Sequence, residues 1–148
     1  MCGVAEAPAR PCENLAMARF YDIDAANARI AELRPVLEAL RADRAELARA
    51  QRRFRAALAS DGAPESAAAL QAHETRVREI VGRMERAVAQ IDAWGVTLRD
   101  IQSGLVDFPA LLAGRQIWLC WRLGEDEIGW WHELSAGFAG RRPLIDLA

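Results

Sequence analysis

The stretch AQIDAWGVTLRDI, residues 89–101, contains the point at which the periodicity of the chain changes. Before Gly95, apolar residues recur every three or four positions, which is the period of an α-helix. Over residues 96–101, apolar and polar residues alternate as they do along a β-strand. Because glycine readily adopts the left-handed conformation that often ends a helix, Gly95 predicts a helix C-cap. We therefore expect helices over residues 20–95 and a small β-rich C-terminal module over residues 96–148.

Upstream of this change, two apolar stripes predict two long helices that pack antiparallel. The first stripe runs from Ile23 to Leu58 at heptad-like spacing, and Asp22 is well placed to cap the free amides of its first turn. The segment SDGAP (residues 60–64) then interrupts the pattern with turn-forming residues. A second heptad stripe follows and ends at Trp94. When the helices are paired about the turn, partner numbers sum to roughly 125 and the apolar positions match along the hairpin.

The predicted hairpin has two candidate partners. Two helices alone bury a single stripe each, and the many alanines on their flanks allow a further helix to approach closely. We therefore expect a coiled-coil-like homodimer through the helices. The alternative is a monomer in which the hairpin packs on its own C-terminal module.

Composition excludes several classes of function. With 148 residues, of which 52% are hydrophobic and 27% charged, the chain has room for one compact domain or for a helical element with a small module. The net charge of -2 gives no overall field that attracts nucleic acid. All 19 basic residues are arginine. The lack of lysine excludes a Walker A phosphate loop and a Schiff-base enzyme, because both need a lysine amine.

The cysteines and the N-terminal segment bear on the cellular compartment. Cys2, Cys12 and Cys120 are odd in number and have no motif spacing, which favours a reducing compartment over a disulfide framework. Residues 1–19 lack the continuous apolar core of a signal peptide and are expected to form a disordered leader. No run approaches the roughly 18 apolar residues that a membrane helix requires. We therefore expect a cytoplasmic protein without membrane association.

The C-terminal module is expected to contain strands joined by tight turns. Residues 104–109 alternate, and residues 115–122 (RQIWLCWR) are rich in β-forming side chains after an Ala113-Gly114 turn. Both faces of the 115–122 strand are substantially apolar. We therefore expect this strand to be covered on both sides, with the helical hairpin as a candidate cover for one side.

Two segments carry a resemblance to a known family. DIDAAN (residues 22–27) and GVTLRDIQSGLVDFPALLAGRQIWLCWRLGEDEIGWWHELSAGFAGRRPL (residues 95–144) resemble the bacterial family catalogued as domain of unknown function 2203. The resemblance spans about residues 20–144 and implies a helical N-terminal portion followed by a compact end module. It implies no established activity. One departure is Ala25, where the family usually carries an acidic residue.

The module also gathers the donor types of a metal site. The candidate metal ligands are Asp107, Cys120, Glu125, Glu127 and His132. Carboxylate, thiolate and imidazole suit zinc or iron, although the sequence requires no cofactor and contains no CxxC or HExxH pair. The alternative for His132 is an imidazole packed among the neighbouring tryptophans and bonded to a backbone carbonyl or to Glu125. A nucleophilic Cys120 is disfavoured, because a thiol in the middle of an apolar strand is usually buried and inert.

A small-ligand site is the second hypothesis for the same region. Its candidate residues are Asp107, Arg122, Glu125, His132 and Arg141. A guanidinium group suits a carboxylate or phosphate ligand. Alternatively, Arg122 pairs with Asp107 across adjacent strands, and Arg141 folds back to a carboxylate of residues 125–127 or lies in a solvated tail.

Four tryptophans of the module admit two interpretations; they are Trp118, Trp121, Trp130 and Trp131. We expect them to fill the core of a small module, which depends on a few large side chains. The alternative is a stacking surface for a planar ligand or a nucleobase. The acidic run of residues 125–127 makes nucleic acid an unfavoured partner.

Taken together, these features favour a non-enzymatic binding or assembly protein with any ligand site in the C-terminal module. The first alternative is a small zinc- or iron-dependent enzyme that uses Asp107, Glu125 and His132. The second is a purely structural oligomer in which the module caps the helices.

Overall fold

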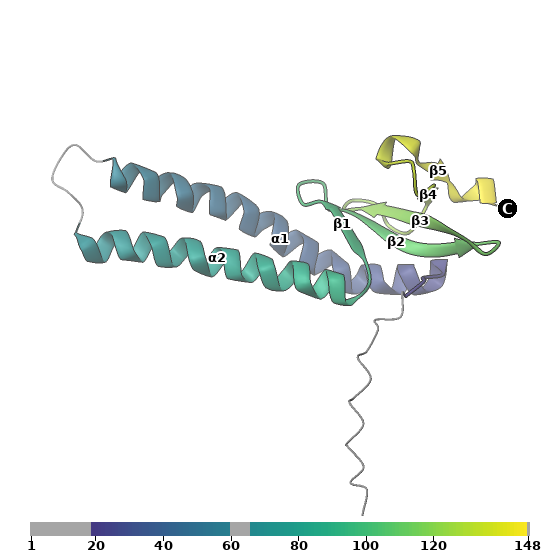
Figure 1. Ribbon diagram of the computed structural model, residues 1–148, viewed down its shortest axis with the longest axis horizontal. Coiled ribbons are helices and arrows are strands. Elements are labelled where there is room, and N and C mark those ends of the chain that lie inside the picture. The colour runs from purple at the N-terminus through teal and green to yellow at the C-terminus, as the bar shows by residue number, and fades with distance from the viewer. Residues whose placement is uncertain (1–18, 60–65, 148) are drawn as a thin grey trace, which may run out of the picture.

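The computed structural model describes residues 19–59 and 66–147, and it consists of a helical hairpin followed by an antiparallel sheet (Figure 1). The helices are α1 (Ile23–Leu58) and α2 (Ala67–Ala93), and the strands are β1 (Thr97–Asp100), β2 (Leu105–Leu112), β3 (Arg115–Arg122), β4 (Trp130–His132) and β5 (Arg142–Pro143). Two short 3-10 helices, η1 (Phe138–Gly140) and η2 (Leu144–Leu147), complete the C-terminal segment. The expected α+β class, with a long hairpin before a β-rich module, is confirmed. Residues 1–18 of the expected leader and the SDGAP turn lie outside the described residues.

The helix ends follow from local hydrogen bonding. Asp22 is the N-cap of α1, and its carboxylate accepts a hydrogen bond of 2.7 Å from the amide of Ala25. After α2, Gly95 has φ +71°, which is the left-handed conformation expected of a residue that follows a helix. Both caps predicted from the sequence are therefore confirmed. None of the helices that the structure describes combines the length and the apolar character needed to cross a bilayer.

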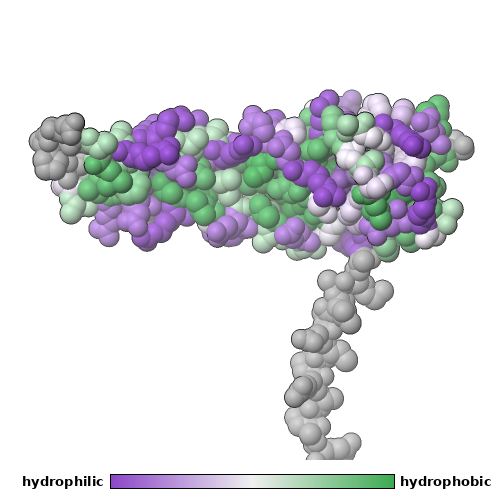
Figure 2. Space-filling model, turned by 45° about the horizontal axis from the view of Figure 1, so that its top comes forward, coloured by the Kyte–Doolittle hydropathy of each residue, from purple (hydrophilic) through white to green (hydrophobic). Residues whose placement is uncertain are grey.

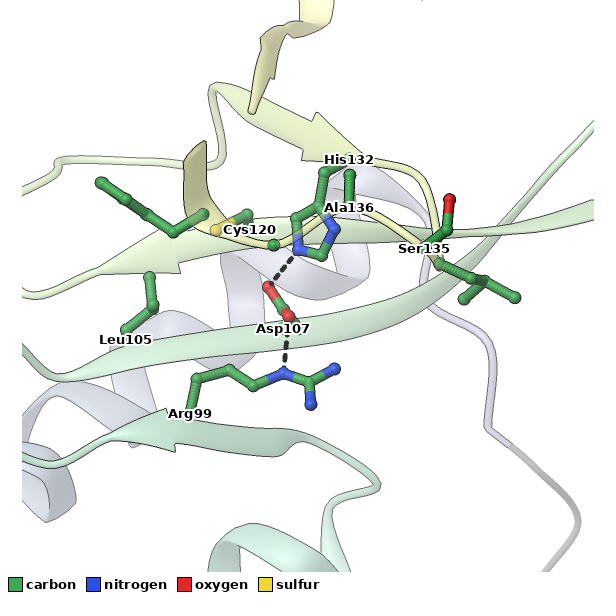
Figure 3. A pocket seen from close by; sticks show the side chains of 10 residues that line it. Arg99, Leu105, Asp107, Cys120, His132, Ser135 and Ala136 are labelled. Atoms are coloured by element: carbon green, nitrogen blue, oxygen red, sulfur yellow. Dashed lines mark hydrogen bonds and ion pairs between the residues drawn. The ribbon is translucent and has the colours of Figure 1, made fainter. Parts of the chain in front are cut away.

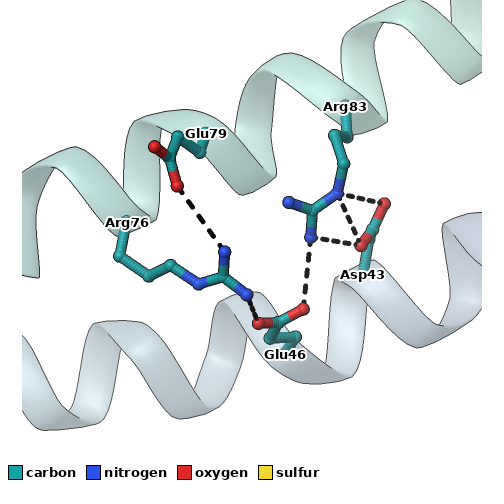
Figure 4. Close-up of polar contacts among 5 residues, drawn as sticks. All are labelled: Asp43, Glu46, Arg76, Glu79 and Arg83. Carbon is teal, nitrogen blue, oxygen red and sulfur yellow. Dashed lines mark hydrogen bonds and ion pairs between the residues drawn. The ribbon is translucent and has the colours of Figure 1, made fainter.

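Polar side chains bridge the two helices along one side of the hairpin (Figure 4). Arg83 of α2 donates to Asp43 of α1 at 2.7 Å and to Glu46 at 3.2 Å. Arg76 of α2 pairs with the same Glu46 and with Glu79 at 3.5 Å. Each exposed ion pair stabilises the fold only slightly, but the connected set favours one register of the helices. The cross-helix pairs lie close to the register expected from the heptad stripes.

The sheet has the strand order β1-β2-β3-β4-β5, with each strand antiparallel to its neighbour. The β2–β3 turn consists of Ala113 and Gly114, whose φ angles of 50° and 77° suit the tight turns of β-hairpins. This short turn fixes the register, so that Asp107 lies opposite Cys120. A further close approach occurs at Gly104, where an added Cβ would lie 2.5 Å from the side chain of Leu123.

One face of the sheet packs on the N-terminal part of α1 (Figure 1). The main contributors from the sheet are Val106, Phe108, Ala110, Ile117, Leu119, Trp121 and Trp131, and those from α1 are Ala26, Ile30, Leu33, Leu37 and Leu40. Two hydrogen bonds tie the layers together: the amide of Tyr21 donates to the carbonyl of Pro109, and the amide of Ile128 donates to the side chain of Asn27. The hairpin thus covers one face of β3, as the sequence indicated. The opposite face of the sheet points away from α1.

Candidate functional site

The outer face of the sheet carries the polar residues of the module. Side chains alternate between the two faces of a strand, so Asp107 on β2 and its partner Cys120 on β3 both point away from α1. His132 on β4 lies opposite Trp118, two residues from Cys120 along β3, and therefore shares this face. The pleat and the register of three neighbouring strands thus bring a carboxylate, a thiol and an imidazole together.

These three side chains form a compact buried group. Their exposed fractions are 2% for Asp107, 0% for Cys120 and 3% for His132. Within the described residues, one donor atom from each can be chosen so that all three atoms lie within 4.8 Å of one another. Asp107 Oδ1 is 3.0 Å from His132 Nε2, a contact drawn as a dashed line in Figure 3. The group is therefore close enough for a single ion to contact all three residues after small side-chain movements.

Hydrogen bonding orients the imidazole of His132. Its Nδ1 lies 2.8 Å from the backbone carbonyl oxygen of Glu133. A carbonyl oxygen only accepts hydrogen bonds, so we infer that Nδ1 carries a hydrogen and donates it. Nε2 is then the nitrogen that faces Asp107. A histidine whose Nδ1 is held by a carbonyl is in the orientation that metal-ligating histidines commonly adopt through Nε2.

Arg99 completes the polar group, and sequence reasoning did not single it out. Its Nε donates to Asp107 Oδ2 at 2.8 Å, so the two oxygens of this carboxylate face Arg99 and His132 on opposite sides (Figure 3). The guanidinium also lies 5.1 Å from the ring centre of Trp118. A register irregularity between Leu98 and Asp100 sets the position of Arg99 on β1. The alternating pattern of residues 96–101 gave no signal of that irregularity.

The environment of Cys120 argues against a nucleophilic role. Burial raises the pKa of the thiol from 9.0 to about 12, and the nearby charge of Asp107 acts in the same direction. At neutral pH the sulfur is therefore a protonated thiol rather than the reactive thiolate. The His132 nitrogens face Glu133 and Asp107, so the imidazole is not positioned as a base for this thiol.

A pocket of about 340 Å³ opens over the three donors. It is lined by Arg99, Leu105, Asp107, Cys120, His132, Leu134, Ser135, Ala136, Gly137 and Phe138. Its floor is the polar group described above, and its walls come from β2 and from the segment between β4 and η1. The contribution of residues 134–138 could not be read from the sequence, because it depends on how the chain returns over the sheet after β4. The pocket thus lies over donors that are themselves almost fully buried.

The remaining sequence candidates form a second cluster. Arg141 donates to both carboxylate oxygens of Glu125, at 2.6 and 2.8 Å, and its guanidinium lies between the rings of Trp130 and Phe138 at 4.9 and 4.8 Å. Of the alternatives considered for Arg141, folding back to a carboxylate is the one that the structure contains. Arg122 also approaches Glu125, at 3.5 Å. Through Arg141, this cluster links the C-terminal segment to Glu125 and to the carbonyl of Cys120 on β3.

The alternative in which Arg122 pairs with Asp107 is wrong. Arg122 lies opposite Leu105 in the β2–β3 register, two positions from the partner of Asp107, and Asp107 pairs with Arg99 instead. Glu127 is exposed and is not part of the three-donor group. The sequence thus named a larger set of donors than the fold brings together.

The four tryptophans divide between the two faces of the sheet. Trp121 and Trp131 are buried in the core against α1, with exposed fractions of 0% and 4%. Trp118 and Trp130 lie on the outer face, where they are stacked by Arg99 and Arg141 respectively. Trp121 and Trp131 therefore fill the core, as expected, whereas the rings of Trp118 and Trp130 lie against arginine side chains on the outer face.

Comparison with known proteins adds the family but no activity. No curated protein and no solved structure matches the chain. The model of the family described as an uncharacterised conserved protein, domain of unknown function 2203, matches residues 19–144, and because this range covers most of the chain, the protein belongs to that family.

Proposed function

We propose that this protein binds a divalent transition-metal ion, with zinc the first candidate, through Asp107, Cys120 and His132. The observation that carries the proposal is the convergence of three chemically different, buried donor groups at the floor of an open pocket. Oxygen, sulfur and nitrogen donors in one site suit zinc or ferrous iron rather than magnesium or calcium. The proposal makes the C-terminal module a binding module and assigns it no reaction.

The geometry is compatible with tetrahedral coordination. Bonds of about 2.0 Å from a central zinc ion place neighbouring oxygen and nitrogen ligands roughly 3.3 Å apart. The 3.0 Å between Asp107 Oδ1 and His132 Nε2 is close to that value. Three protein ligands leave the fourth position to water or to a small molecule. That position would face the pocket, because the sheet backbone occupies the other side of the donors.

A purely structural role for the same residues is the competing explanation. The Asp107–His132 contact joins β2 to β4 across β3, and a buried polar pair of this kind fixes the arrangement of strands. Breaking such a pair by removing one partner commonly costs about 3–5 kcal/mol. Loss of stability in a variant therefore does not separate the two roles, whereas metal content and metal-dependent stability do.

The test begins with protein purified without a histidine tag and analysed for zinc and iron. We expect about one equivalent of metal per chain after zinc loading. We also expect a higher melting temperature with zinc than with a chelator, because a ligand that binds the folded state stabilises it by mass action. Asp107→Asn, Cys120→Ser and His132→Gln should each lower zinc affinity by more than the roughly 10–100-fold that loss of a supporting partner causes. Glu127→Gln, an exposed carboxylate of the same module, is the matched control and should bind as the wild type does.

Two results would contradict the proposal. The first is folded wild-type protein that retains no zinc or iron above background and shows no zinc-dependent change in melting temperature. The second is unchanged zinc affinity in the three ligand variants, because the metal would then bind elsewhere.

Assembly through the hairpin is a second candidate function. A largely apolar groove on the hairpin is lined by Leu47, Val81, Met84, Val88 and Ala89, together with the acidic residues Glu85 and Asp92. Figure 2 shows apolar surface along the hairpin between two rows of polar side chains. We propose that a second copy of the chain covers this groove.

Charge on α2 favours an antiparallel arrangement of the two copies. Arg78 lies seven residues, or about two turns, before Glu85 and therefore on the same side of the helix. Two copies of α2 packed antiparallel about Val81 would place Arg78 of one copy against Glu85 of the other.

A further inference from the structure

We propose that the pocket above the metal site binds a small organic carboxylate, with the carboxylate group held between the metal ion and Arg99. This inference rests on the proposed metal site and names the class of its external ligand. It is carried by charge, by the orientation of Arg99 and by the nature of the pocket walls.

The charges at the floor of the pocket favour an anion. Arg99 lines the pocket, and a divalent ion held by the three donors would add positive charge at its floor. The Asp107 carboxylate, 2.8 Å from Arg99, offsets only part of that charge and leaves an excess of positive charge. In a half-buried pocket such an excess is worth more than in water, because screening is weaker. A monoanion neutralises it, whereas a neutral ligand does not.

Arg99 is positioned to bind that anion. Its Nε is bonded to Asp107 and its guanidinium carbon lies over the ring of Trp118, 5.1 Å from the ring centre, so two neighbours position the group. Within the residues that the structure describes, its hydrogen bonds use Nε, so the two terminal nitrogens of this pocket-lining side chain remain available to a ligand (Figure 3). A planar guanidinium edge matches a planar carboxylate better than it matches a spherical anion.

The walls indicate the rest of the ligand. Leu105, Leu134, Ala136 and Phe138 give the pocket an apolar lining above the charged floor. The volume of about 340 Å³ is near the lower end of the roughly 300–1,000 Å³ typical of small-molecule pockets. A single arginine beside an apolar lining fits a monocarboxylate better than the higher charge of a phosphate group. The chemistry therefore fits a short organic acid with an apolar body.

Cobalt-substituted protein provides the test. Co(II) that replaces zinc has visible absorption bands that change when its fourth ligand changes, so the spectrum reports both metal occupancy and exchange at the open position. We would titrate acetate, butyrate and benzoate into the cobalt protein, with butyramide as the neutral control and inorganic phosphate as the alternative anion. The expected result is a saturable spectral change with the carboxylates, stronger for butyrate and benzoate than for acetate, and little change with butyramide or phosphate.

Two variants assign the response to Arg99. Arg99→Ala should still develop the cobalt bands. It should bind butyrate at least about tenfold more weakly than the wild type, because a charge-assisted hydrogen bond is lost. Arg99→Lys keeps the charge without the planar fork and should fall between Arg99→Ala and the wild type. Arg53→Ala removes an exposed arginine of α1 and should leave the titration unchanged.

Each outcome has a distinct meaning. Cobalt bands with no response to any carboxylate, or with an equal response to butyramide or phosphate, would overturn the carboxylate inference and leave the metal site standing. An equal butyrate response in Arg99→Ala and wild type would overturn the role of Arg99. Absence of cobalt bands in the wild type would overturn the proposed metal site itself.

Discussion

The proposed metal site makes a quantitative prediction about pH, because Cys120 must lose a proton before it can bind a metal ion. Burial holds the pKa of this thiol at about 12 instead of 9.0. At pH 7 the thiolate is therefore about a thousandfold rarer than for a thiol of ordinary pKa, which corresponds to about 4 kcal/mol of metal-binding free energy. Zinc binding releases the proton, so affinity must rise with pH.

The shape of the pH dependence follows from the raised pKa. A thiol with a pKa of 9.0 would stop contributing to the slope above pH 9, whereas Cys120 should add one logarithmic unit of zinc affinity per pH unit up to about pH 12. We would measure zinc affinity by competition with a chromophoric chelator between pH 6.5 and 9.5, in wild type and in Cys120→Ser. The serine variant retains the other donors and their protons. The difference between the two slopes should be one proton per zinc ion across the whole range.

Two outcomes would refute this reasoning. Equal slopes in wild type and Cys120→Ser would mean that the thiol is not a ligand. A difference that disappears above pH 9 would mean that the thiol binds zinc from an exposed, ordinary environment rather than from the buried position described here. Calorimetry in buffers of different ionisation enthalpy provides an independent count of the protons released.

Three further predictions concern stability and assembly. Gly104→Ala should lower the free energy of unfolding by about 1–3 kcal/mol in urea denaturation, because φ is +64° and the added Cβ would meet Leu123; Gly129→Ala, with open space around it, is the control and should change little. In the presence of a chelator, wild type should lose stability relative to Cys120→Ala as pH rises from about 9 toward 12, by about 1 kcal/mol at pH 10. The reason is that the thiol ionises at a lower pH in the unfolded chain than in the fold, and parallel pH profiles of the two proteins would contradict a buried thiol. Sedimentation velocity should show a dimer for wild type and a monomer for Met84→Glu, and a monomeric wild type at high concentration would contradict assembly through the hairpin.

The helices and the boundaries of β3 were predictable because they depend on local periodicity, caps and turns. Asp22 and Gly95 act through residues within one helical turn, so their roles can be read from sequence alone. The strand of residues 115–122 agrees with the observed β3. In these elements the nearest neighbours along the chain supply the decisive interactions.

Part of the site was predictable from the turn between β2 and β3. The sequence placed a turn at Ala113-Gly114, and counting outward from a two-residue turn puts Asp107 opposite Cys120. The expected pairing of Asp107 with Arg122 ignored this count and was displaced by two residues, which preserves the face but changes the partner. The prediction thus used the alternation of side chains along each strand correctly, but it did not use the register that a two-residue turn imposes.

Other parts of the site depend on long-range structure that sequence patterns do not encode. Arg99 reaches Asp107 across a register irregularity in β1, and no residue type marks that irregularity. Glu125 has the right chemistry for a ligand, but the return of the chain after η1 places Arg141 on it and satisfies both of its oxygens. The candidate list was correct in chemistry, and the fold selected among its members by geometry.

The two faces of the sheet explain how the molecule accommodates a polar site without losing its core. Strand alternation sends Val106 and Phe108 into the packing with α1 and sends the intervening Asp107 to the opposite side. A conservative change such as His132→Gln therefore alters the pocket without creating a cavity against α1. The hairpin groove around Met84 lies on separate elements from the pocket, so metal binding and assembly should respond independently to substitution. If zinc loading shifted the monomer–dimer equilibrium, this separation would be wrong, and the shared core between α1 and the sheet would be the path that couples the two.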